Sequence, residues 1–432
     1  MKVLIICAPD PFANGLYPKE LAGYLRAKGC EVEIYPTNHL SRKGESGLAA
    51  VLPGLKPSQL ALYFMEAVGY AADRLGPTLQ RAALSATFRR IIQLRGSTLR
   101  AKLANSSYDM IICEHNLDNA FIAGGRLART QILHLPAPFA EELFFGGQIT
   151  DRAFKKLRDY EAKLYAKADH IGFHWHTYTD YVKRTKYDGP NLDVNLPFGV
   201  EHQDKRATFQ SQPRIVFLGL LSGYWVNLPL LKRLCKLYPN IDIYGGPRLT
   251  ELGDNYKGYA PTTDVLAEYQ FGLITLSDDP LRRSGFSSKQ LRYYSYGLPV
   301  LSPSWRHDGV LDEAALLYDE HTFVDLIKSY SDEERWNELS AKALKIAQHY
   351  DWEQVLRPFD ALLDQARLRD DRLRASSWLT SLYTAADNPL ISRRKVGRSS
   401  VFPFPSESAS PRSHPRHGGS IGMRGGKRKE RQ

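Results

Sequence analysis

The sequence predicts an α/β protein made of two doubly wound, parallel-sheet domains. Short apolar runs rich in β-branched residues alternate with amphipathic helical stretches along most of the chain. The alternation pauses at a polar, linker-like segment, residues 203–213, and then starts afresh. Strands that alternate with helices specify parallel sheets covered by helices. The 432 residues suffice for two or three domains of about 150 residues each. We expect domains at 1–205 and 206–350, helices within 351–385, and a tail at 391–432.

The first domain is expected to open with a βαβ unit. The run VLIIC at 3–7 predicts a buried strand, residues 16–28 a helix that Gly29 ends, and EVEIY at 31–35 the next strand. The unit recurs as a strand at 110–113, a helix at 117–128 and a strand at 131–135. A helix at 150–167, a strand at 170–174 and a closing segment at 193–201 complete the half.

The second domain repeats this alternation. Strands are expected at 214–219, 241–246, 271–276 and 298–302, with helices at 228–238 and 288–296. Two further helices, 333–349 and 352–368, end the ordered part. Ligands of such sheets bind at the carboxyl ends of the strands, so the site is expected in the cleft between the two halves.

The composition excludes several protein classes. Hydrophobic residues are 43% and charged residues 24%, which excludes a mostly disordered or fibrous chain. No apolar run reaches the roughly 18 residues of a membrane-spanning helix, and the N-terminus lacks the pattern of a secretory signal. The four cysteines lie far apart without metal-ligand spacing, which favours a reduced, cytoplasmic protein.

The positive charge is concentrated in the tail. The chain carries a net charge of +11, and residues 391–432 hold eleven Lys or Arg against two Glu, so the rest is close to neutral. The tail is rich in Ser, Pro, Gly and Arg and is expected to be disordered. No specific nucleic-acid partner is therefore expected for the folded part, although an RNA-binding protein that uses this tail stays an alternative.

A second basic stretch lies at residues 74–108. It has no acidic residue, and apolar side chains recur in it at helical spacing. Such a stretch suits an anionic membrane surface, which predicts a peripheral location on the inner face of the cell membrane. The alternative is a helix that packs on the sheet with a solvated charged face. The basic residues are Arg74, Arg81, Arg89, Arg90, Arg95, Arg100 and Lys102.

The most informative segment is SGFSSKQLRYYSYGLPVLSP at 284–303. A loop of small residues leads into a helix that carries Lys289 in its first turn, directly after Ser288. The N–H groups and the positive dipole end of a helix form a site for anions, and Lys289 adds a full charge where a diphosphate would lie. Gly297 can adopt the left-handed conformation that turns the chain into the next strand.

This segment resembles the donor-site signature of many GT-B glycosyltransferases. Lys289, Tyr293, Gly297, Pro299 and Val300 match the signature. The segment from residue 214 resembles the start of the C-terminal domain of these enzymes, and HYDWEQVLRPFDALL resembles the closing helix that crosses back to the first domain. The resemblance covers about residues 1–368 and implies a nucleotide-sugar substrate without a further cofactor. The implied binding residues are Gly219, Ser288, Lys289, Arg292 and Tyr293.

Within this group, SSKQLRYYSYGLP is most similar to the GumK-like, xanthan-type glucuronosyltransferases. That likeness implies a monotopic, metal-independent, inverting enzyme that transfers glucuronate from UDP-glucuronate to a lipid-linked oligosaccharide. Arg292 stands where that family has Gln, and Ser284 and Arg292 stand where the retaining family 4 has two glutamates. These differences argue for inversion. Arg292 is expected to pair with a phosphate or a donor carboxylate, unless it is a surface arginine that caps its helix.

Inversion requires one base on the acceptor side. Asp10, Glu141 and His115 follow expected strands of the first domain and are the ranked candidates, in that order, with Glu114 and Glu142 as unranked ones beside them. A solvated loop position is the ordinary alternative for each. No metal site is expected, because the spacing of His170, His174 and His176 suits no known ligand set. Asp278 and Asp279 are expected to form a turn.

The sequence thus predicts a glycosyltransferase of exopolysaccharide or surface-glycan assembly, with a nucleotide-sugar donor and a lipid-linked saccharide acceptor. A nucleotide-sugar epimerase on the same fold is the alternative enzyme.

Overall fold

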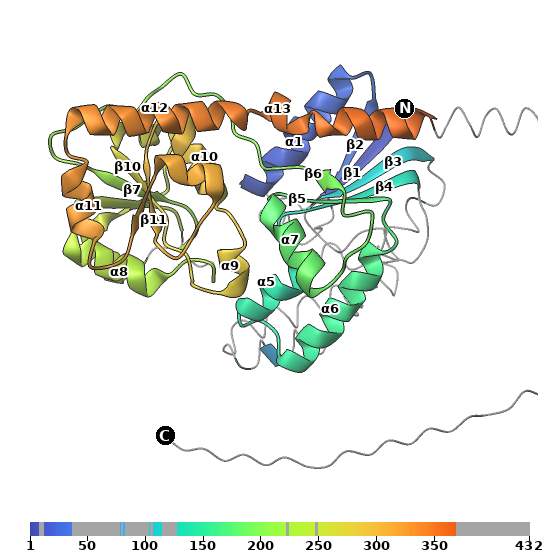
Figure 1. Ribbon diagram of the computed structural model, residues 1–432, viewed down its shortest axis with the longest axis horizontal. Coiled ribbons are helices and arrows are strands. Elements are labelled where there is room, and N and C mark those ends of the chain that lie inside the picture. The colour runs from blue at the N-terminus through green and yellow to red at the C-terminus, as the bar shows by residue number, and fades with distance from the viewer. Residues whose placement is uncertain are drawn as a thin grey trace, which may run out of the picture. The chain divides into compact units, whose positions relative to one another are not determined.

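The computed structural model describes residues 1–7, 13–36, 78, 81–82, 103, 107–114, 128–221, 224–246 and 249–368. Two six-stranded sheets, each entirely parallel in its pairing, organise this part of the chain (Figure 1). The α/β class and the division into two Rossmann-like halves are therefore confirmed.

The first sheet has the strand order β2-β1-β3-β4-β5-β6. Its central strands are almost fully buried, as expected for continuous apolar runs covered by helices on both faces. The strands are β1 (Lys2–Cys7), β2 (Glu31–Pro36), β3 (Tyr108–Glu114), β4 (Ala128–Leu135), β5 (His170–Phe173) and β6 (Val194–Asn195).

Helix α1 (Ala13–Ala27) and helix α13 (Trp352–Leu356) pack on one face of this sheet and share an apolar core with β1 and β3 (Figure 1). A further helical stretch, 358–368, follows α13. The hydroxyl of Tyr24 donates to Asp360, at 2.9 Å, so this helical stretch is tied to α1. The expected return of the C-terminal helices to the first domain is confirmed.

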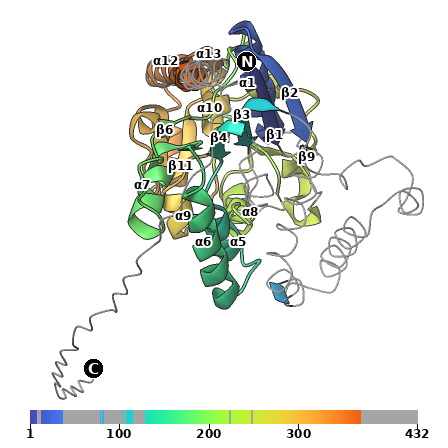
Figure 2. The same cartoon turned by 90° about the vertical axis from the view of Figure 1, so that its right-hand side faces the viewer.

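Helices α5 (Phe139–Phe145) and α6 (Asp151–Tyr165) pack against each other, side by side in both views (Figures 1 and 2). Thr150 caps α6 by accepting from the Ala153 amide. Helix α7 (His176–Thr185) follows β5 directly.

The second sheet has the order β12-β11-β10-β7-β8-β9. The chain order reverses between β7 and β10, and this switch point is where ligands of such sheets bind. The strands are β7 (Ile215–Leu218), β8 (Ile241–Tyr244), β9 (Tyr256–Gly258), β10 (Phe271–Leu273), β11 (Val300–Pro303) and β12 (Ala315–Tyr318). The helices are α8 (Leu228–Leu237), α9 (Pro280–Arg283), α10 (Ser288–Ser295), α11 (Phe323–Ser329) and α12 (Glu333–His349).

Most expected elements are confirmed within one to three residues, with a few differences. Ala128 begins strand β4 and does not end a helix. The short strands β9 and β12 and helices α5, α9 and α11 were not predicted, because runs of three to seven residues carry weak periodicity. Of the basic stretch, only residues 78, 81–82, 103 and 107–108 are described, and the whole tail lies outside the described residues.

No helix in the described ranges has the length and apolar character that crossing a bilayer requires.

Candidate active site

Two glycines form the floor of the candidate donor site. Gly219 directly follows β7 with φ +153°, and Gly245 directly follows β8 with φ +141°. A Cβ atom on Gly245 would lie 1.8 Å from the carbonyl oxygen of Gly219, and one on Gly219 would lie 2.3 Å from Cε of Lys289. Only glycine permits this approach of two backbones beneath a lysine side chain.

Lys289 lies over the switch point of the second sheet. Its Nζ is 4.7 Å from the centre of the Phe217 ring on β7. Burial, followed by the positive charges of Arg292 and Arg282, lowers the pKa of Lys289 to about 8. Among the described residues no carboxylate forms an ion pair with Lys289. Lys289 in the first turn of α10 and Arg292 in its last turn, beside an Arg282 that pairs with Glu142, form a cation cluster suited to bind an anion.

Ser288 and Arg292 lie one helical turn apart on α10. Both line a small cavity of about 60 Å³, together with Thr263 and the segment that leaves the first domain, which contributes Phe198, Gly199, Val200, Glu201 and Gln203. Burial lowers the pKa of Arg292, and Glu201 opposes this effect. Arg292 is thus not a solvated surface residue, and it belongs to the cation cluster around Lys289.

Tyr293 supports the site from beneath. The side chain is buried, and its hydroxyl accepts from the Leu218 amide at 2.9 Å. A Cβ on Gly272 of β10 would lie 2.4 Å from the Tyr293 ring. The tyrosine therefore fixes α10 against β7 and β10. Whether it also touches a ligand stays a prediction, as do the binding roles of the other α10 residues.

Contacts with the first domain hold the loop that leads into α10. Arg282 pairs with Glu142 at 3.3 Å, and the Thr177 hydroxyl donates to the carbonyl of Ser284. The rings of Trp175 and Phe286 stack with centroids 4.5 Å apart. These contacts bring the N-terminal end of α10 to the carboxyl edge of the first sheet, as the expected cleft requires.

Of the three candidate bases, Asp10 and His115 lie outside the described residues. Glu141 is fully buried on α5, where its carboxylate pairs with Lys186 at 2.5 Å and with Arg158 at 3.4 Å. Glu161 of α6 also pairs with Lys186. Burial is the main cause that raises the pKa of Glu141. A role in proton transfer would first require this buried cluster to open.

A second buried cluster was not predicted from the sequence. It consists of Glu114, His134 and His174, whose nearest ligand atoms all lie within 4.8 Å of one another. His134 faces Glu114 through Nδ1, while its Nε2 lies 2.9 Å from the carbonyl oxygen of Leu196. His134, and after it His174, offset the effect of burial and lower the pKa of Glu114 to about 2.

Aromatic rings enclose this cluster. The ring of Tyr17 lies 4.3 Å from that of His134 and 5.2 Å from that of His174, and Phe198 lies 5.7 Å from His174. One pattern in the sequence could have indicated this cluster. Glu114 ends β3, His134 lies opposite it near the end of β4, and His174 directly follows β5, so strand register brings the three together.

The other polar motifs have structural partners. His170 pairs with Asp193 at 3.0 Å, and His176 begins α7, so His170, His174 and His176 form no common ligand set. Asp279 accepts from the Leu281 and Arg282 amides and caps α9, as the expected turn implied.

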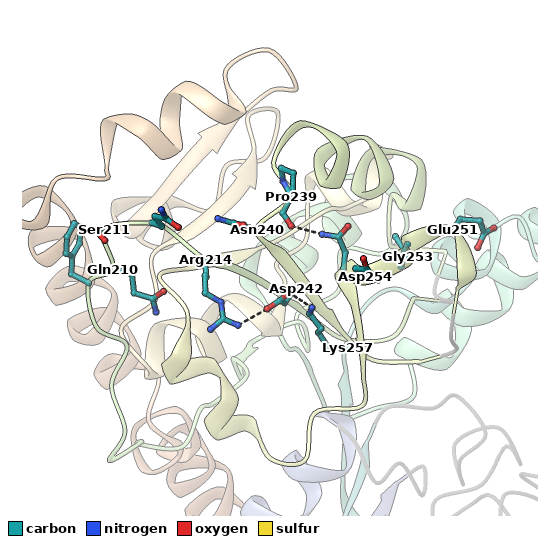
Figure 3. A pocket seen from close by; sticks show the side chains of 14 residues that line it. Gln210, Ser211, Arg214, Pro239, Asn240, Asp242, Glu251, Gly253, Asp254 and Lys257 are labelled. Carbon is teal, nitrogen blue, oxygen red and sulfur yellow. Dashed lines mark hydrogen bonds and ion pairs between the residues drawn. The ribbon is translucent and has the colours of Figure 1, made fainter.

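A cavity of about 1120 Å³ lies at the opposite, amino-terminal edge of the second sheet (Figure 3). Its lining is polar, and Asp242 pairs there with Arg214 at 2.8 Å and with Lys257 at 3.3 Å. Arg214 and Asn240 precede β7 and β8, whereas Lys289 lies at the carboxyl ends of the strands. The carboxyl-end rule for such sheets therefore favours the Lys289 edge as the candidate donor site.

Comparison with solved structures shows the same architecture. The chain is similar to sucrose-phosphate synthase from Thermosynechococcus elongatus, with a TM-score of 0.58 and 13% identity over 85% of this chain and 100% of that one. It is also similar to a glycosyltransferase from Rickettsia africae, with a TM-score of 0.53 and 10% identity over 84% and 98%. No protein-family model and no curated protein matches the sequence. The chain has the GT-B fold.

Proposed function

We propose that this protein is a glycosyltransferase that takes a sugar from a nucleoside-diphosphate donor, most readily a UDP-sugar. The position of Lys289 carries the proposal. Its ammonium lies over β7 at the switch point, above the glycine floor and at the N-terminal end of α10. Glycosyl transfer from such a donor leaves a diphosphate, and Lys289 and Arg292, which form no ion pair among the described residues, would offset its charge here.

Because the same cations would stabilise the charge of the leaving diphosphate, no metal ion would be needed there. The acceptor hydroxyl attacks the anomeric carbon, the bond from that carbon to the diphosphate oxygen breaks, and a base takes the hydroxyl proton. Lys289, Arg292 and the amides of α10 offset the charge of the leaving group. Ser284 and Arg292 in place of two glutamates favour inversion. Asp10, His115 and Glu141 stay the candidate bases.

The acceptor is proposed to be a lipid-linked saccharide at the inner face of the cell membrane, in exopolysaccharide or surface-glycan assembly. The support for it is the acid-free basic stretch at 74–108 and the GumK-like sequence SSKQLRYYSYGLP, which also makes UDP-glucuronate a candidate donor.

A ligand screen with a matched pair of variants tests the donor. UDP-, GDP- and dTDP-sugars are screened by the shift in melting temperature, and the best ligand is titrated by calorimetry. Lys289→Ala should weaken its binding by roughly 10- to 150-fold, the equivalent of one charge-assisted hydrogen bond. Arg283→Ala is the control, since this nearby exposed arginine pairs with Asp278. Equal affinity of wild type and Lys289→Ala would remove Lys289 from the site.

A further inference from the structure

We propose that Glu114, His134 and His174 bind a divalent transition-metal ion of the Zn²⁺ type in the first domain, and that Cys7, which the strand register places next to Glu114, turns in as the fourth ligand. Glu114 and His134 are 0% exposed and His174 4%, and their ligand atoms converge within 4.8 Å. The site shares the apolar core in which α1 and α13 pack, and the proposal does not depend on the proposed function.

The hydrogen bonds of His134 show that a positive charge lies between this ring and Glu114. The Leu196 carbonyl only accepts, so Nε2 of His134 carries a proton that it donates at 2.9 Å. In a neutral ring Nδ1 then holds a lone pair, and this atom faces Oε1 of Glu114. A proton on Nδ1 makes this contact an imidazolium–carboxylate pair, whereas a metal ion can take the proton's place only after the two groups move apart.

The surrounding donors favour the metal ion. A shared proton needs only two partners, yet Nε2 of His174 also lies 3.8 Å from Oε2 of the same Glu114. In the register of β1 with β3, Ile6 lies opposite Cys113, which puts Cys7 beside Glu114. Because side chains alternate along a strand, Cys7 and Glu114 lie on the sheet face that Ile5 and Ile112 share with α1.

This donor set matches a tetrahedral zinc site. Imidazole nitrogen, carboxylate oxygen and thiolate sulfur are the usual ligands of Zn²⁺, at roughly 2.0 to 2.3 Å. Metal-bound histidines commonly donate their other N–H to a backbone carbonyl, as His134 does to Leu196. The rings of Tyr17 and Phe198 pack against the histidines, and Trp352 packs on both rings. The ion would therefore be structural and would join β1, β3, β4 and the end of β5.

The metal content of the full-length protein tests the proposal without any sugar nucleotide. Protein purified without added metal, and protein dialysed against Zn²⁺, are analysed by inductively coupled plasma mass spectrometry. The expected result is about one ion per chain. Replacement by Co²⁺ should give the visible d–d bands of a four-coordinate site and a near-ultraviolet band from the cobalt–thiolate bond. Folded protein that holds no metal under either condition would overturn the proposal.

Variants distinguish metal bound at this site from metal bound adventitiously elsewhere on the protein. Cys7→Ser should remove the thiolate band while the d–d bands stay, and His174→Gln should lower the metal content at least tenfold. Cys113→Ser and His170→Gln are the controls, since Cys113 belongs to the other apolar core and His170 pairs with Asp193. A metal that all four variants retain is adventitious and contradicts the proposal. If the two test variants do not fold, the X-ray absorption spectrum of the wild type decides, by showing or lacking nitrogen and sulfur ligands.

Discussion

A Cβ atom placed on Gly219 would lie 2.3 Å from Cε of Lys289. The lysine therefore extends across the place where any other residue would carry its side chain. The glycine that ends β7 and the lysine in the first turn of α10 are 70 residues apart in sequence, and together they make the most specific feature of the candidate donor site.

Gly219→Ala and Gly245→Ala should have different effects. The alanine at 219 meets the flexible end of Lys289, which can move away, so we expect a folded protein with about tenfold weaker nucleotide binding. The alanine at 245 would lie 1.8 Å from the backbone oxygen of Gly219, so the protein should lose stability. Calorimetric titration and thermal denaturation check the two effects. Normal nucleotide affinity in Gly219→Ala would contradict the proposed contact of donor and lysine.

Nucleotide binding should take up protons near pH 8. The pKa of Lys289 is lowered to about 8 in the free protein, and a bound diphosphate would raise it again by favouring the charged form. Little uptake is expected at pH 6.5, where the ammonium is already charged, and the affinity should fall as the pH rises past 8. Titrations in two buffers of different ionisation enthalpy measure the uptake. Lys289→Met should abolish it, and uptake that persists in this variant would assign it to another group.

Lys186→Met should destabilise the fold. The lysine side chain is 1% exposed and pairs with Glu141 and Glu161, both 0% exposed. Its removal leaves Glu161 without a cation among the described residues and Glu141 with Arg158 alone. Breaking a buried pair in this way costs about 3–5 kcal/mol. Urea denaturation measures the free energy of unfolding. Lys183→Met is the control, an exposed lysine of the same helix, and equal losses in both variants would speak against the cluster.

The basic stretch is expected to hold the protein on anionic membranes. Replacing Arg89, Arg90, Arg95 and Arg100 by Gln should abolish sedimentation with phosphatidylserine vesicles, because each basic residue near such a surface contributes about 1 kcal/mol. Wild-type binding should fall as the salt concentration rises. Neutral vesicles are the control. Sedimentation of the variant equal to that of the wild type would rule out this stretch as the membrane contact.

Transfer from an α-linked UDP-sugar should give a β-linked product. Ser284 and Arg292 stand where retaining enzymes of family 4 have two glutamates, and one base then suffices for inversion. The coupling constant of the anomeric proton shows whether the product is α- or β-linked. An α-linked product would contradict inversion. Activity should persist in EDTA. If EDTA removes the activity and Mg²⁺ or Mn²⁺ restores it, a metal ion acts at the diphosphate. That ion would be distinct from the proposed Zn²⁺ of the first domain, which the metal analysis measures.

The sequence predicted the donor half well for a local reason. The loop, helix, glycine and strand at 284–303 are consecutive, so a motif contains their whole geometry, and helix α12 appears at the residues expected from its periodicity. The acceptor half was harder. Glu141 looked like a loop carboxylate, but the partners that bury it, Lys186 and Glu161, come from other helices.

By itself the sequence determined the alternation of strands and helices, the two halves and the loop–helix–strand unit at 284–303, because apolar periodicity, turn residues and helix termini act over a few neighbouring positions. Only the tertiary structure decided which distant residues meet. Parallel pairing sets Cys7, Glu114 and His134 on one face of adjacent strands, and the crossing of α13 closes that face with Trp352. Register and packing act between segments far apart in the chain, so no local pattern records them.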